Sequence, residues 1–322
     1  MLKRPSSDIW RVGIVPAPIE GLDEVKLAGL RHNIVWLPDA GPWRYLADPF
    51  GLVRGDALHV FVEAYDYRTK RANIERHELA LDGLVWRSKR VVLDLPVHLS
   101  YPYVFEHGGE TWMLPETHQG NELALYRGDA SLDRWERFAP LLQDLPVADA
   151  SLIEFEGRWW LFYTLVGKGG RDQRELHVAH AQSLFGPWQP CGANPVVNDL
   201  AGGRPAGRPF VDAQGVVCLP VQDCSGGYGS AARMLRMVEL SADRIRTDPL
   251  DLRLTGDLVS REYRAGLHTL SACGDFTLID VKRIEHSRGR QWLDFKRRLR
   301  RLGGALKAVQ APTRTDFEAT AL

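Results

Sequence analysis

Residues 48–63 read DPFGLVRGDALHVFVE: an apolar run, a turn at Gly55-Asp56, and a second apolar run that ends in an acid. Two runs of β-branched and aromatic residues joined by a glycine-containing turn are typical of a β-hairpin. The same pattern occurs at four further places. These are YPYVFEHGGETWMLPE (101–116), DASLIEFEGRWWLFYT (149–164), RPFVDAQGVVCLPVQD (208–223) and HTLSACGDFTLIDVK (268–282). The chain is therefore built on an internal repeat.

The spacing of the repeats indicates the fold. The hairpins begin 53, 48, 59 and 60 residues apart. Third-strand candidates follow the first four hairpins, at 74–79, 123–127, 176–181 and 234–240, and Trp86, Trp135 and Trp188 mark short fourth strands. Four strands per unit, repeated five times, predict an all-β fold, a five-bladed β-propeller. Strands near 9–15 and 34–37 are expected to complete the last blade, and a β-sandwich with chance similarity between hairpins is the alternative.

Composition narrows the class of protein. The 322 residues are 44% hydrophobic and 25% charged, which is globular usage. Lys plus Arg equals Asp plus Glu at 41 each, so no overall charge favours nucleic acid, and none is predicted as a partner. The start, MLKRPSSDIW, lacks the apolar region of a secretion signal, and no run approaches the ~18 apolar residues of a membrane-spanning helix. Four cysteines without a C-x-x-C pair are expected to be buried thiols, and the predicted location is cytoplasmic.

The hairpin ends predict where the chemistry lies. The opening and closing residues of an antiparallel hairpin face each other at its open end, and the innermost strands of a propeller line its channel. We therefore expect the polar residues at these ends to surround one mouth of the channel. They are Asp48, Glu63, Tyr101, Glu116, Asp149, Thr164, Arg208, Gln222, Asp223, His268 and Lys282.

Asp48, Glu116 and Asp149 are the predicted catalytic residues. Carboxyl groups across a cleft suit glycosidic chemistry, in which one protonates the leaving oxygen and another activates water or an acceptor hydroxyl. Mutual repulsion raises the pKa of at least one such group, as a general acid requires. Glu63 is a weaker candidate, assigned to substrate binding. The alternative is that each carboxylate only accepts hydrogen bonds from backbone amides.

Blades four and five are expected to contribute Arg208, His268 and Lys282, with Arg204 just before them. These cations suit a phosphate or a carboxylate, which predicts a small anionic sugar substrate; alternatively they neutralise the acids. Other predicted contacts come from Gln222, Asp223, Tyr101, Tyr228 and His118, and from Trp43 or Tyr103 stacking on a sugar ring. The ten histidines form no spaced ligand set, so neither a metal nor a cofactor is predicted.

The chain end differs from the rest, which divides the chain into a propeller (1–285) and a basic amphipathic helix and tail (286–322). Trp292, Phe295, Leu299 and Leu302 share one helical face among five Lys and Arg residues. Such a helix can contact an anionic membrane surface, or it can dock against the side of the propeller.

These motifs resemble a known family. ADPF at Asp48, PYV…LPE ending at Glu116, DASL…LFYT at Asp149 and GRPF at Arg208 are similar to the five-bladed propellers of family 43 glycoside hydrolases. More closely, the set resembles the N-terminal module of glucosamine inositolphosphorylceramide transferases and its stand-alone bacterial relatives, some of which accompany formyltransferase-like domains. The resemblance implies a pocket for carbohydrate with Asp48 as general base.

Family 43 enzymes place an acidic modulator at the start of blade two and the acid on blade three. Here those blades open with Tyr101 and Asp149, which leaves Glu116 as the acid by elimination. Three functions follow as expectations. The first is a carbohydrate-active transferase of glycoconjugate or surface-polysaccharide synthesis, acting on a nucleotide- or phospho-linked sugar. The others are an inverting hydrolase of family 43 type, and a non-catalytic sugar-binding propeller that partners a separate formyl- or acyltransferase.

Overall fold

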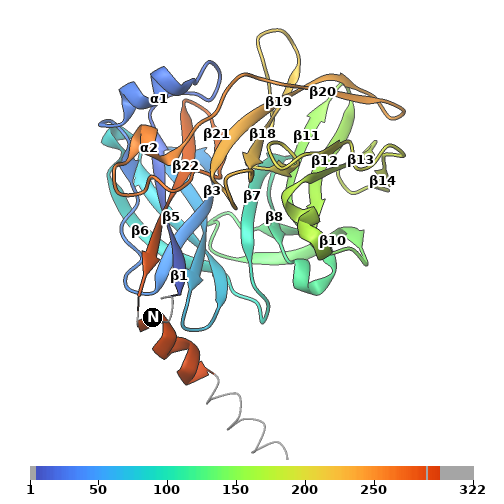
Figure 1. The fold of residues 1–322 in the computed structure, drawn as a ribbon. Coiled ribbons are helices and arrows are strands. Elements are labelled where there is room, and N and C mark those ends of the chain that lie inside the picture. The colour runs from blue at the N-terminus through green and yellow to red at the C-terminus, as the bar shows by residue number, and fades with distance from the viewer. Residues whose placement is uncertain (1–4, 288, 298–322) are drawn as a thin grey trace, which may run out of the picture. The chain divides into compact units, whose positions relative to one another are not determined.

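The computed structural model describes residues 5–287 and 289–297; residues 1–4, 288 and 298–322 lie outside the description. The chain divides into two compact units, one of residues 8–284 and one of residues 1–7 with 285–322. The larger unit consists of five antiparallel sheets arranged as the blades of a propeller (Figure 1). The all-β, five-bladed prediction is thus confirmed.

Each sheet is a blade with four strands along its main path. Blade one contains β3 (Arg44–Arg54), β4 (Ala57–Asp66), β5 (Arg71–Ala80) and β6 (Trp86–Leu93). Blade two contains β7 (Ser100–His107), β8 (Glu110–Glu116), β9 (Glu122–Gly128) and β10 (Trp135–Gln143). Blade three contains β11 (Val147–Phe155), β12 (Arg158–Leu165), β13 (Glu175–Ala181) and β14 (Gln189–Pro190), with β15 (Val197–Asn198) paired to β13.

The last two blades close the ring. Blade four contains β16 (Arg204–Pro205), β18 (Val217–Asp223), β19 (Ala231–Leu240) and β20 (Ile245–Pro249), with β17 (Phe210–Val211) paired to β18. Blade five joins β21 (Leu270–Cys273) and β22 (Phe276–His286) to β1 (Ser6–Val15) and β2 (Val35–Trp36) from the start of the chain. The predicted closure by N-terminal strands is therefore confirmed.

Helices are few and short. The helices α1 (Glu24–Leu30) and α2 (Gly256–Val259) contact each other, and Asp23 caps α1 through its side chain. The 3₁₀ turns are η1 (Asp82–Leu84), η2 (His118–Gly120) and η3 (Lys168–Gln173). In the smaller unit, residues 289–297 are helical, and the rest of the predicted basic helix lies outside the described residues. Within the part of the chain described, no helix is long and apolar enough to cross a membrane.

The first three blades open with the same backbone irregularity. Asp48, Tyr101 and Asp149 have φ angles of 50°, 46° and 47°, in the left-handed region that non-glycine residues rarely occupy. At each of them the pairing register between the first two strands shifts by one residue, which is a β-bulge. Such strained bulges re-aim a side chain and persist only where the surroundings hold them. The repeat in the sequence is therefore a repeat of this bulge.

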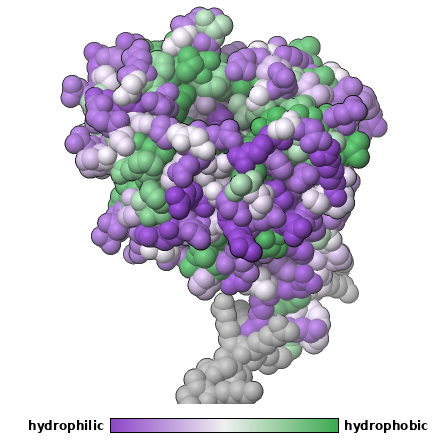
Figure 2. Space-filling model, turned by 180° about the vertical axis from the view of Figure 1, so that it is seen from behind, coloured by the Kyte–Doolittle hydropathy of each residue, from purple (hydrophilic) through white to green (hydrophobic). Residues whose placement is uncertain are grey.

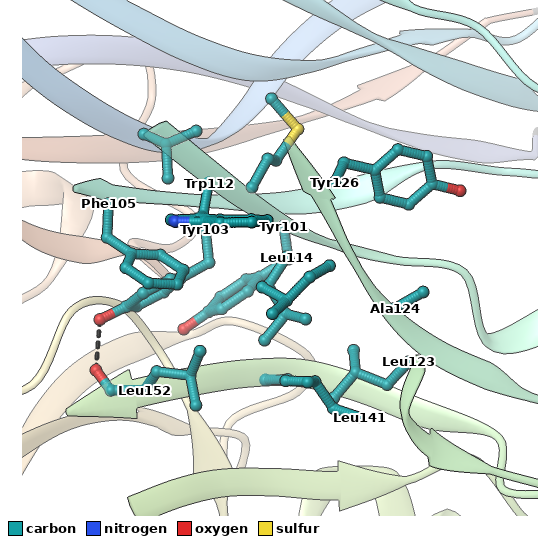
Figure 3. Packing of buried hydrophobic residues seen from close by; sticks show 14 of the residues in the cluster. Tyr101, Tyr103, Phe105, Trp112, Leu114, Leu123, Ala124, Tyr126, Leu141 and Leu152 are labelled. Atoms are coloured by element: carbon teal, nitrogen blue, oxygen red, sulfur yellow. Dashed lines mark hydrogen bonds between the residues drawn. The ribbon is translucent and has the colours of Figure 1, made fainter. Parts of the chain in front are cut away.

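Apolar side chains fill the space between the blades. The largest cluster joins blades one, two and three and includes Trp112, Phe61 and Leu161. Figure 3 shows part of it, with the Tyr103 hydroxyl donating a hydrogen bond to the carbonyl oxygen of Leu152. The face seen in Figure 2 is mostly hydrophilic and is interrupted by apolar patches. The four cysteines are buried and unpaired, as predicted.

Gly207 marks a close backbone approach between blades four and five. The Leu270 amide donates to the Ala206 carbonyl oxygen at 2.6 Å, and a Cβ on Gly207 would lie 2.1 Å from the Leu270 carbonyl oxygen. We therefore predict that Gly207→Ala lowers the free energy of unfolding by about 2 kcal/mol or more, measured by urea denaturation. Gly29→Ala, at a helical position with no atom within 4 Å, is the control and should be neutral or stabilising. Equal effects of the two substitutions would contradict this account of the blade junction.

Candidate functional site

Five buried carboxyl groups occupy the mouth of the channel at which the inner strands begin. They belong to Asp48, Glu63, Glu116, Asp149 and Asp280, which are 5%, 5%, 6%, 3% and 0% exposed. Burying so many ionisable groups is unfavourable unless each is hydrogen-bonded, paired with a base, or protonated. The structure uses all three of these solutions.

Backbone amides supply the first solution, from one blade to the next. An Asp280 oxygen accepts a hydrogen bond from the Asp48 amide at 2.9 Å. Asp48 in turn accepts from the Tyr101 amide at 3.2 Å, and Glu116 accepts from the Asp149 amide at 3.2 Å. In each case the amide belongs to a residue with a left-handed φ. These carboxylates therefore hold the strained bulges as well as lining the site.

Three basic groups supply the second solution. Arg204 donates from Nε to Asp149 at 2.5 Å, His118 Nδ1 lies 2.7 Å from Glu116, and His268 Nδ1 lies 2.7 Å from Asp280. The carboxyl groups of Asp280 and Asp48 raise the pKa of His268 against the effect of burial, and the hydrogen bond to Glu116 raises that of His118. Three cations cannot neutralise five carboxylates, so electroneutrality in this buried cluster favours two retained protons.

The pKa values indicate where those protons reside. Burial, with the charges of Asp48 and Glu116, raises the pKa of Glu63 well above its usual range. Burial also raises the pKa of Asp149 to about 8, although Arg204 opposes the rise. For Glu116, burial is outweighed by the His118 hydrogen bond and the Arg204 charge, and the pKa falls to about 2. Environments that push neighbouring pKa values apart are how active sites assign acids and bases.

Glu63 is the proton carrier without a cationic partner in contact. The Tyr45 hydroxyl donates to it at 3.4 Å, and His98 Nε2 lies 3.6 Å away, but burial lowers the pKa of His98 and favours the neutral imidazole. The neighbouring Asp48 carboxyl group raises the pKa of Glu63 further. Glu63 and Asp48 are therefore two adjacent carboxyl groups whose pKa values are both raised.

The side of the site formed by blades four and five is closed. Trp10 stacks on His268 with ring centroids 3.7 Å apart, and Tyr228 meets the same imidazole edge-on. Gln222 donates to Asp149 at 2.9 Å. Of the substrate-binding residues predicted from sequence, Gln222, His268, Tyr228, His118 and Glu63 thus lie at the carboxylate cluster.

Arg208 lies elsewhere. Its guanidinium donates to the carbonyl oxygens of Ala272, Gly51 and Val104 and lies over the Tyr103 ring. It lines an open pocket of about 250 Å³ with His107, at the end of β7, and Trp159, near the start of β12. In blade four it is Arg204, not Arg208, that pairs with Gln222, because four residues separate β16 from β17. The expected place of Arg208 at the rim is therefore taken by Arg204.

Three further predicted rim residues have partners inside the chain. Lys282 donates to the carbonyl oxygen of Tyr228 and lies 3.5 Å from Asp8. Asp223 accepts from Ser225 and Arg253. The Tyr101 hydroxyl lies 2.9 Å from Ser151, and the ring packs edge-on to Phe50. These contacts are structural. Tyr103, one of the two expected sugar-stacking residues, is only 2% exposed.

Sequence reasoning missed Asp280, Tyr45 and His98. Asp280 lies two residues before Lys282, the closing residue of its hairpin. The comparison of hairpin ends selects Lys282 and therefore passes over Asp280. Among the described residues, Asp48, His268 and Asp280 also form a group whose ligand atoms lie within 4.8 Å of one another, as a metal site requires. The Asp280 oxygens already accept hydrogen bonds from the amides of Asp48, His268 and Thr269 and from the Thr269 hydroxyl. This donor set is occupied by the protein itself.

The raised pKa of Asp149 predicts a pH dependence of stability. A carboxyl group that binds its proton more tightly when folded stabilises the fold at low pH. This contribution is lost as the pH rises from 3.8, the ordinary pKa of an aspartate, towards about 8, the pKa of Asp149 in the folded protein. We expect the free energy of unfolding of the wild type, relative to Asp149→Asn, to fall across that interval. Urea denaturation from pH 4.5 to pH 8 measures it. A constant difference would mean that Arg204 keeps Asp149 ionised throughout.

Comparisons with known proteins agree with this architecture. The profile of the family described as "Glucosamine inositolphosphorylceramide transferase 1, N-terminal" matches residues 37–270. The glucosamine inositolphosphorylceramide transferase 1 of Oryza sativa subsp. indica is 33% identical over 214 residues, 66% of this chain and 28% of that protein. The protein of the same name from Arabidopsis thaliana is 32% identical, over 74% of this chain and 33% of that one. The chain thus spans about a third of the length of these relatives.

Solved structures show the same fold at low sequence identity. A family 117 glycoside hydrolase from Zobellia galactanivorans is 12% identical, with a TM-score of 0.52 over 88% of this chain and 92% of that one. An α-L-arabinofuranosidase from Podospora anserina is also 12% identical, with a TM-score of 0.51 over 74% of this chain and 90% of that one. The profile covers most of the propeller, and the match includes Asp48, Glu63, Glu116 and Asp149. The chain therefore belongs to the family of the N-terminal module of glucosamine inositolphosphorylceramide transferase 1.

Proposed function

We propose that this chain is a carbohydrate-active transferase module of glycoconjugate or surface-polysaccharide synthesis. In this proposal the neighbouring carboxyl groups of Glu63 and Asp48 perform acid–base chemistry on a nucleotide- or phospho-linked sugar. The pair is the observation that carries the proposal, because one carboxyl group is set up to donate a proton and its neighbour to accept one. The names of the relatives, which are sugar transferases, support the same reading.

Glu63 is the proton donor in this mechanism. Burial and the neighbouring negative charges keep it protonated, and no cation pairs with it closely enough to remove the proton. It would protonate the oxygen that leaves the sugar. Glu116, favoured as the acid by elimination from the sequence, is held ionised by His118 and Arg204 and has no proton to give at neutral pH. Glu116 instead fixes the amide of Asp149.

Asp48 is the proton acceptor. Burial raises its pKa, but His268 opposes the rise, and the Tyr101 amide and Thr269 hydroxyl donate hydrogen bonds to its oxygens. It would take the proton of the acceptor hydroxyl as that oxygen attacks the sugar.

The inverting hydrolase makes a different demand on the carboxyl groups. Inverting enzymes hold their two carboxyl groups roughly 6.5–9.5 Å apart, so that water fits opposite the leaving group. Glu63 and Asp48 are neighbours that raise each other's pKa, so an inverting enzyme would have to pair Asp48 with another carboxyl group. A sugar-binding propeller that assists a separate formyl- or acyltransferase remains the alternative, and it requires no proton transfer.

The proposed negative charge of the substrate requires a cation that solvent can reach. Lys282, Arg204 and His268 are 5%, 7% and 2% exposed and are bonded within the chain. His118 differs, because its side chain is 25% exposed while its pKa is raised. A phosphate that enters from solvent would therefore meet the His118 imidazolium first.

We predict that Glu63→Gln and Asp48→Asn each lower turnover by about 10²-fold or more, since both remove a proton-transfer group. The assay is product formation from a panel of nucleotide sugars with alcohol acceptors, and from matched neutral oligosaccharides. Glu75→Gln is the matched control: Glu75 is also a buried blade-one glutamate, but it pairs with Arg44 and Lys89 outside the site. Wild-type turnover in Glu63→Gln would remove it from the mechanism. Activity on neutral oligosaccharides alone would favour the hydrolase.

We also propose that the basic C-terminal segment contacts an anionic membrane surface. In the helix at 289–297, the Trp292 and Phe295 rings stack with centroids 5.5 Å apart and remain 55% and 49% exposed, and the Lys296 ammonium lies over Trp292. The sequence from 296 to 301 is KRRLRR. Exposed aromatic rings beside a basic run fit the headgroup region of anionic lipids.

Vesicle sedimentation tests this contact. The chain should bind phosphatidylserine-containing vesicles more tightly than phosphatidylcholine vesicles, and Trp292→Ala with Phe295→Ala should weaken that binding about tenfold or more. Val25→Ala, at an 82% exposed apolar residue of the other unit, is the control. If neither vesicle type binds, the apolar face has another partner, such as the side of the propeller.

A further inference from the structure

We propose that four aromatic rings form the subsite that holds an uncharged sugar ring beside Glu63. These rings, which we call the aromatic arc, belong to Tyr45, Tyr65, His98 and His118. This inference rests on the proposed function and specifies which side of the carboxylate cluster the sugar occupies. The arc lies on blades one and two, whereas Trp10 and His268 belong to blade five.

The four rings form a continuous series. Tyr45 and Tyr65, paired across β3 and β4, are stacked with centroids 4.8 Å apart and planes 13° apart. Tyr65 meets His98 edge-on at 5.8 Å, and His98 meets His118 at 6.4 Å. Tyr45 and Tyr65 come from the ends of two neighbouring strands, His98 from the loop after β6, and His118 from η2. Separate elements thus converge on one aromatic wall.

The polar atoms of the arc contact two of the buried carboxyl groups. The Tyr45 hydroxyl and His98 Nε2 both contact Glu63, and His118 Nδ1 contacts Glu116. A ring placed against this wall therefore has its substituent oxygens next to the proton of Glu63. None of the cations of blades four and five reaches Glu63 in a hydrogen bond or ion pair within the described residues.

Exposure distinguishes this side from the other. Tyr45 and Tyr65 are half-buried, and the side chains of His98 and His118 are 19% and 25% exposed. On the side formed by blades four and five, Trp10 and His268 are 4% and 2% exposed and Tyr228 is half-buried. All four rings of the arc are partly exposed, so solvent reaches them beside the buried carboxyl groups.

The chemistry of the arc selects a sugar ring. Aromatic faces bind the apolar C–H face of a pyranose, while hydroxyl and imidazole edges bind its hydroxyl groups. Burial lowers the pKa of His98, so its imidazole is neutral and can both donate to and accept from a hydroxyl. Tyr45, Tyr65 and the neutral His98 therefore match an uncharged polyhydroxyl ring better than a phosphate, which would require donors alone. His118, the last ring of the series, has a raised pKa and is the group that a phosphate attached to that sugar would meet.

NMR titration tests the subsite directly. The imidazole Hε1 signals of His98 and His118 are followed while N-acetylglucosamine, galactose or arabinose is added; sorbitol, a polyol without a ring, is the control ligand. We expect at least one sugar, but not sorbitol, to shift both signals. In Tyr65→Ala its affinity should fall about tenfold, whereas Tyr65→Phe, which keeps the ring, should bind nearly as the wild type does.

A matched variant controls for loss of aromatic surface. Phe138→Ala removes a 47% exposed ring on β10, outside the arc, and should leave binding unchanged. Absence of a shift with every sugar, or wild-type affinity in Tyr65→Ala, would overturn the subsite. The outcome also separates the two proposals: sugar binding at the arc with full activity in Glu63→Gln contradicts only the mechanism, and loss of activity in Glu63→Gln with wild-type binding by Tyr65→Ala contradicts only the subsite.

Discussion

Burial of five carboxyl groups at the junctions between blades is the constraint on which the site depends. None of Asp48, Glu63, Glu116, Asp149 and Asp280 is more than 6% exposed, so the protein must replace the water they lose. Amides of the following blade do so for Asp280, Asp48 and Glu116. The same hydrogen bonds fix the left-handed residues that open the blades. Closure of the ring and preparation of the site are therefore one set of interactions.

The fold was predictable because the determining information is periodic. The hairpins that open at Asp48, Tyr101 and Asp149 have the same length, so their sequences match position by position. The structure places a bulge with nearly the same φ at each of these opening residues. Completion of blade five by the N-terminal strand was also predictable, because four hairpins had third strands and the last had none. Convergence of Asp48, Glu116 and Asp149 follows from the alignment alone.

The hydrogen-bond partners and the protonation of the site residues were not predictable from the sequence. They depend on the exact number of residues between strands and on how deeply each side chain is buried. Four residues separate β16 from β17, so Arg204 rather than Arg208 lies at the rim. No sequence pattern indicates this separation. The contrast between Glu63 and Glu116 is similar. Both close a hairpin on a strand of the same register, yet only Glu116 has His118 within 2.7 Å, so one glutamate keeps a proton and the other loses it.

The last blade shows why the site must be considered as a whole. The match to the family profile ends at residue 270, but blade five is completed by β22 and by β1, which lie beyond its two ends. These strands supply Asp280, which fixes His268 and the Asp48 amide, and Trp10, which covers the His268 ring. His268 in turn opposes the rise in the pKa of Asp48. The pKa of Asp48 therefore depends on residues from both ends of the propeller, and the strands that close the ring help to set the electrostatics of the site.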